Sequence, residues 1–147
     1  PYAALAAGGA LTLIGHGLLL GIVAPDLKPL WLSNRAAKAL TIAGASPAQG
    51  VYPGPVTIAG YEEPSLVFLL GTETELGDSA DAADAIGDGR PAIVEGRQAA
   101  TFQAALAADG LTARRVGEGA GLDYSNNHHD VLQIFLPARA PAPKAEP

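Results

Sequence analysis

The sequence contains no cysteine, and this absence excludes several classes of site. Without thiols the chain has no disulfide framework, no thiolate nucleophile and no cysteine-based zinc centre. It also contains no methionine, so it does not begin at a start codon, and we expect a fragment of a longer protein. Catalytic residues encoded upstream would then lie outside these 147 residues.

Basic side chains are scarce as well. Nine Lys and Arg stand against fifteen Asp and Glu, which gives a net charge of −6 and a pI near 4.8. Nucleic-acid binding needs a basic surface, so the composition argues against a nucleic-acid partner. Aromatic residues make up only 5% of the chain, whereas 48% is hydrophobic.

About 100 residues follow the apolar N-terminal segment and its connection, which is enough for one domain.

What the chain does have is an uncharged stretch from Ala3 to Ala24, in which Thr12 and His16 are the polar side chains. About 20 helical residues cross the hydrocarbon core of a bilayer, so we predict a transmembrane helix over residues 1–25. The run is long for a signal peptide, and it has neither a basic start nor a small-residue cleavage pattern. A fully buried soluble helix is the alternative. His16 is interpreted as a neutral imidazole bonded to a neighbouring helix.

Residues 26–55 predict an interfacial helix and a linker. Trp31 suits the headgroup layer, and a short amphipathic helix extends from there to about Leu40. Two interpretations stay open: this helix lies on the membrane surface, or it packs on the domain. The Pro- and Gly-rich run 44–55 is typical of a linker. Basic residues after the membrane helix would by themselves favour the cytoplasmic side, namely Lys28, Arg35 and Lys38.

Residues 56–136 alternate short apolar runs with helical segments. Strands are predicted at 56–59, 72–76, 91–95, 111–116 and 131–136, with helices at 64–70, 79–87 and 98–109. This alternation implies an α/β fold, with a mainly parallel sheet covered by helices on both faces and a Rossmann-like topology. The last strand follows a loop, which is compatible with an antiparallel orientation. The helix at 64–70 is uniformly apolar after Ser65 and is predicted to be buried. The tail 137–147 is predicted to be disordered.

The turn after the first strand holds the candidate substrate-binding residues, Tyr61, Glu62 and Glu63. Ligands of open α/β sheets bind at the carboxyl ends of the strands, where this turn lies. Two carboxylates and a phenol there could hold a sugar, a metal or a neighbouring loop. The alternative is a capped turn with solvated acids.

Two further patterns carry less chemistry. The run Gly117–Gly121 is similar to a phosphate loop, but Leu122 breaks the G-x-G-x-x-G spacing and no helix follows, so 117–130 predicts a flexible loop. Residue types that ligate metals occur at Asp123, His128, His129 and Asp130. Adjacent histidines in a strand face opposite sides, so we predict no metal site. No nucleophile motif, zinc-protease motif or P-loop lysine is present, and no catalytic residue is predicted in this chain.

Three segments carry a family resemblance. Residues 30–35 read LWLSNR, residues 58–72 read IAGYEEPSLVFLLGT, and residues 121–127 read GLDYSNN. The first two resemble the C-terminal part of bacterial integral-membrane glycosyltransferases, the family 39-like group of dolichyl-phosphate-mannose–protein mannosyltransferases and the lipid A aminoarabinose transferase. The third is similar to a G-x-N-Y-S segment near the end of such proteins, with Asp123 where Asn is usual.

The resemblance implies a role for the whole protein. In that group a many-helix membrane domain ends in a last helix and a small periplasmic α/β domain. The parent would transfer a sugar from a polyprenyl-phosphate donor to a lipid or protein acceptor at the periplasmic side of the inner membrane, and a divalent metal is possible there. The family's catalytic carboxylates lie near the start of the membrane domain, so none is carried over to this chain.

The expected function is therefore that of an accessory domain, with the bilayer and the upstream membrane domain as its partners. It would shape the acceptor side or stabilise the membrane loops. A different class of function is a single-span, membrane-anchored α/β binding module without catalysis. A third, a soluble nucleotide-binding enzyme, lacks a phosphate loop.

Overall fold

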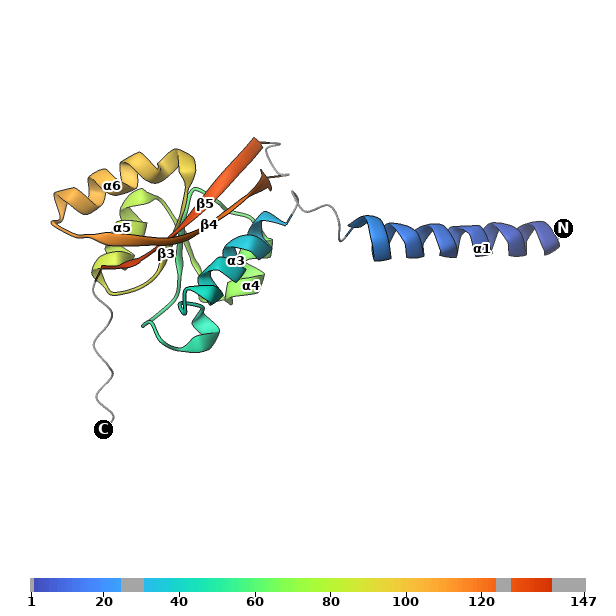
Figure 1. Ribbon diagram of the computed structural model, residues 1–147, viewed down its shortest axis with the longest axis horizontal. Coiled ribbons are helices and arrows are strands. Elements are labelled where there is room, and N and C mark those ends of the chain that lie inside the picture. Colours follow the sequence, from blue (N-terminus) through green and yellow to red (C-terminus); the bar gives the residue numbers. More distant parts are fainter. Residues whose placement is uncertain (1, 25–30, 124–127, 139–147) are drawn as a thin grey trace.

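The computed structural model describes residues 2–24, 31–123 and 128–138, which form an N-terminal helix and an α/β domain (Figure 1). Helix α1 (Tyr2–Leu18) continues into a π-helical turn, η1 (Leu19–Val23). By length and composition this 22-residue segment can cross a membrane. No residue of α1 or η1 is buried, so this helix does not form part of the core of the described α/β domain.

Five strands form one sheet in the order β2-β1-β3-β5-β4. The strands are β1 (Thr57–Ala59), β2 (Glu75–Gly77), β3 (Ala92–Glu95), β4 (Ala113–Asp123) and β5 (His128–Pro137). Strand β1 pairs in parallel with β2 and β3, whereas β5 is antiparallel to both β3 and β4. Four strands therefore run in one direction and β5 runs against them. This confirms the predicted α/β fold and the antiparallel last strand.

Helices cover both faces of the sheet. Helices α3 (Leu32–Ile42) and α4 (Pro64–Leu70) pack on one face, and α5 (Ser79–Gly87) and α6 (Ala99–Ala108) pack on the other. A hydrophobic core lies on each face of the sheet. Side chains alternate along a strand, so Ile93 of β3 packs in the core under α3 and α4, and Val94 packs in the core under α5 and α6. In the second core the Phe102 and Phe135 ring centroids lie 4.8 Å apart.

Helix α3 is an integral part of the domain. Leu32, Ala36 and Leu40 are spaced four residues apart and are fully buried against the sheet, as one face of a helix must be. The apolar face of this helix therefore packs on the domain, as the second interpretation expects. The domain core begins at residue 32, ahead of the boundary expected at residue 56. The predicted linker 44–55 contains a short 3-10 turn, η3 (Pro47–Gln49).

The Gly-rich segment is a strand, so the predicted flexible loop over 117–130 is wrong for its described residues. Strand β4 continues to Asp123 and pairs with β5 from His128 onward. Glycines alternate along β4 because α3 crosses it closely: a Cβ on Gly119 would lie 2.9 Å from the Ala36 backbone nitrogen. Residues 124–127 and most of the tail predicted to be disordered lie outside the described residues.

Candidate functional site

The turn after β1 separates the three predicted substrate-binding side chains. Tyr61 is buried, Glu62 is exposed, and Glu63 is buried at the start of α4. The Tyr61 hydroxyl lies 2.9 Å from Ser33 Oγ, so the phenol points towards α3 and contributes to packing. The structure thus gives the three residues different environments, and substrate binding by them stays a prediction.

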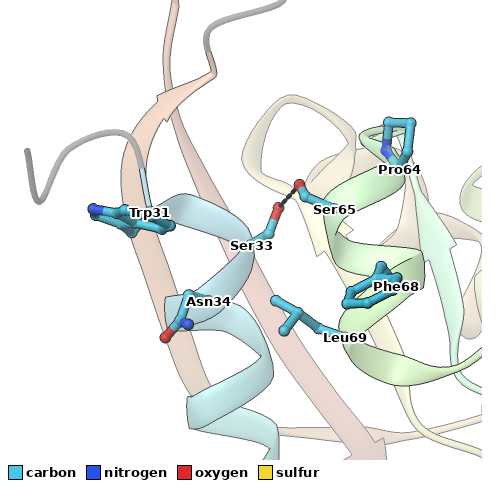
Figure 2. Close-up of a pocket in the computed structure, with 7 residues that line it drawn as sticks. All are labelled: Trp31, Ser33, Asn34, Pro64, Ser65, Phe68 and Leu69. Atoms are coloured by element: carbon cyan, nitrogen blue, oxygen red, sulfur yellow. Dashed lines mark hydrogen bonds between the residues drawn. The ribbon is translucent and has the colours of Figure 1, made fainter. Parts of the chain in front are cut away.

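A groove opens beside this turn, between the start of α3 and helix α4 (Figure 2). Its volume is about 440 Å³, and its lining is Trp31, Ser33, Asn34, Pro64, Ser65, Phe68 and Leu69. Most of the lining is apolar. The polar contact drawn in Figure 2 joins Ser33 Oγ to Ser65 Oγ at 2.8 Å and ties the two helices together. Small-molecule sites have this general composition of apolar walls and few polar groups.

The apolar walls of the groove are unusually exposed. Phe68 is 88% exposed, Trp31 is 47% exposed and Leu69 is 45% exposed. The prediction that the 64–70 helix is buried is therefore correct for only one side of α4, where Leu66 and Leu70 face the core. The sequence contains a signal for this one-sided burial, because Leu66 and Leu70 lie four positions apart on one side of the helix. Phe68, midway between them, then lies on the opposite side.

Acidic side chains gather at the carboxyl ends of β3 and β4. Glu95 ends β3, Asp123 ends β4, and Asp130 lies on β5, and all three are buried. Arg97 Nε donates to Glu95 Oε1 at 2.7 Å, and Arg97 Nη2 lies 3.7 Å from Asp130 Oδ2. Burial raises the pKa of Glu95, and the charge of Asp130 raises it further, against the opposing effect of Arg97.

This cluster contains two of the four residues that the sequence singled out as metal-ligand types, Asp123 and Asp130. The structure adds Glu95, which the sequence analysis missed because it lies on a different strand. His128 and His129 are exposed on β5. Over residues 2–24, 31–123 and 128–138, no three His, Asp or Glu side chains are arranged to hold a metal ion.

The sheet edge beside the cluster is filled by side chains. Gly60 follows β1 with φ 85°, and a Cβ there would lie 2.7 Å from Glu95 Oε2 and 2.8 Å from Gln98 Nε2. Gln98 in turn accepts a hydrogen bond from Ser79 Oγ at 2.8 Å. A doubly wound sheet binds nucleotides in a crevice at this edge, so the close packing here does not favour the nucleotide-binding alternative.

His16 bonds within its own helix. Its Nδ1 lies 3.0 Å from the Thr12 carbonyl oxygen, one turn earlier in α1. His16 Nδ1 therefore has a partner within α1 and does not need the expected hydrogen bond to a neighbouring helix.

Comparison of the chain with protein-family models, curated proteins and solved structures finds no significant match.

Proposed function

We propose that the chain is the C-terminal region of an integral-membrane glycosyltransferase, with α1 as a membrane helix and the α/β domain as an accessory element. The parent would transfer a sugar from a polyprenyl-phosphate donor to a lipid or protein acceptor. In this proposal the domain lies on the periplasmic side of the bacterial inner membrane, as the sequence resemblance implies.

One observation carries the proposal: two of the segments that resemble this group meet in space. Residues 31–35 and 58–72 are separated by a linker, yet Ser33 from the first lies within hydrogen-bond distance of Tyr61 and Ser65 from the second. Every residue lining the groove belongs to one of these two segments. The two segments that resemble the family therefore form the same groove. This is expected when the sequence similarity reflects a shared site.

The domain supplies no catalytic residue in this proposal. The buried carboxylates near Arg97 are held by an ion pair at a packed sheet edge, and the groove is lined mainly by apolar groups. Among the described residues no three His, Asp or Glu side chains are arranged to hold a metal ion, and the proposal places any divalent metal of the parent in the upstream membrane domain. The groove instead suits an apolar surface or chain beside the membrane, which agrees with an element that shapes the acceptor side.

The alternative is a membrane-anchored binding module, which the candidate membrane span over Tyr2–Val23 and the groove would also suit. Deleting the complete reading frame and comparing glycolipids and glycoproteins by mass spectrometry separates the two. The transferase proposal expects one sugar decoration to disappear and to return with the intact gene. Unchanged glycans would contradict it and favour the binding module.

A further inference from the structure

We infer that the face formed by α3 and α4 is a membrane-docking surface, with Trp31, Phe68 and Leu69 seated in the headgroup layer of the bilayer. The proposal uses only the membrane-anchoring part of the proposed function. It assigns an orientation to the domain, which neither the sequence resemblance nor the sugar-transfer chemistry supplies.

The first argument is the length of the tether. Ala24 is the last described residue of the N-terminal helical segment, and Trp31 opens the domain seven residues later. A chain spans at most about 3.6 Å per residue, so Trp31 stays within about 25 Å of the end of the helix. A domain of about 100 residues is itself roughly 25 Å wide, as wide as this reach. The start of α3 therefore cannot lie on the side of the domain farthest from the membrane.

The second argument is the exposed apolar surface beside the start of α3. Phe68 and Leu69 line the same groove as Trp31, although they lie more than 30 positions along the chain. Isolated exposed apolar residues are ordinary, but a contiguous patch marks an interaction site. Aromatic side chains are favoured at the bilayer interface, where an apolar ring and a polar neighbour are both accommodated.

The third argument is the distribution of charge between the two faces. Helix α3 carries Arg35 and Lys38 and no acid, and Arg35 Nη1 donates to the Ala120 carbonyl oxygen of β4 at 2.6 Å. Helix α4 itself is uncharged, but the exposed acids Glu62 and Glu73 lie just before and just after it. Helix α5, on the opposite face, carries Asp81 and Asp84 and no base. Anionic lipid headgroups attract basic residues and repel acidic ones. Charge therefore favours an orientation with the α3 side of this face, rather than α5, towards the bilayer.

The chain contains a single tryptophan, which makes the test direct. The full chain is reconstituted in phosphatidylcholine–phosphatidylglycerol vesicles that contain brominated phosphatidylcholine, a quencher of indole emission. A Trp31→Phe/Phe68→Trp variant moves the fluorophore to the centre of the proposed surface. A Trp31→Phe/Gln103→Trp variant places it at an exposed position of α6 on the opposite face, as the matched control.

We expect position 68 to show blue-shifted emission that brominated lipid largely removes, whereas position 103 keeps its emission. Equal, unquenched emission from both positions in chains that float with the vesicles would overturn the docking surface and leave anchoring intact. Blue-shifted but unquenched emission at position 68 would overturn it too, because protein rather than lipid would then cover the face. Failure to float would contradict membrane anchoring itself.

Discussion

The hydroxyl groups of Ser33 and Tyr61 lie 2.9 Å apart in a buried position, where they join the first turn of α3 to the turn after β1. Ser33 Oγ also lies 2.8 Å from Ser65 Oγ on α4. One small side chain thus links three separate elements beside the groove. The position of α3 against α4, and with it the shape of the groove, depends on this contact.

Replacing Tyr61 tests the contact without creating a large cavity. Tyr61→Phe removes the phenol oxygen and leaves Ser33 its contact with Ser65. We expect the free energy of unfolding to fall by about 1 kcal/mol, the usual net contribution of a hydrogen bond. Urea unfolding of the full chain in detergent micelles measures this. Tyr52→Phe is the matched control, because Tyr52 packs against the same core but is only half-buried. An equal loss in both variants would contradict the assignment.

A pair of phenylalanines distinguishes the α5/α6 core from the exposed groove. Phe102 is fully buried between α6 and the sheet, whereas Phe68 is 88% exposed. Phe102→Ala removes a packed ring and leaves a cavity, so we expect a loss of about 3–5 kcal/mol. Phe68→Ala should change the free energy of unfolding by less than about 0.5 kcal/mol. Comparable losses at the two positions would show that Phe68 is covered in the monomer.

Gly119 tests the explanation given for the glycines of β4. In Gly119→Ala the new methyl group meets the backbone of Ala36, which cannot rotate away as a side chain could. We expect a loss of about 1–3 kcal/mol from overpacking, seen as a lower melting temperature by circular dichroism. Glu118→Ala, at the neighbouring exposed position, should be close to neutral. A neutral Gly119→Ala would mean that α3 does not approach β4 as closely as described.

The buried carboxylate of Glu95 makes stability depend on pH. Its pKa is raised above the ordinary value of 4.5, chiefly by burial, so the folded state holds this proton more tightly than the unfolded state. Stability contributed by this group is therefore lost as pH rises from 4.5 through the raised pKa. Glu95→Gln cannot ionise and should lose less stability over that interval. Urea unfolding at a series of pH values measures it, and a decline equal to that of the wild type would assign the effect to another group.

The sequence predicted the succession of strands and helices along the chain and their α/β layers, because both follow from local patterns. The alternation of short apolar runs with helical segments acts over a few positions and is visible in a single sequence. The prediction for the Gly-rich segment is wrong, because a run of glycines in a single sequence favours a flexible loop over a strand. Their alternate spacing reflects the close crossing of α3, a contact between residues about 80 positions apart.

The groove and the carboxylate cluster could be predicted only in part, for the same reason. Tyr61 was correctly placed in the turn after β1, but its contact with Ser33 depends on how α3 docks. The sequence marks Asp123 and Asp130 as residue types that ligate metals. Their proximity to Glu95 arises from the pairing of β5 with β3, which the sequence alone left undefined.

The DNA that precedes the codon for Pro1 tests the central claim most directly. The glycosyltransferase proposal predicts that the reading frame continues upstream through many further hydrophobic spans. It also predicts an early loop with acidic residues, where the parent's catalytic carboxylates would lie. A start codon immediately before Pro1 would contradict the proposal and leave a lone, membrane-anchored α/β module.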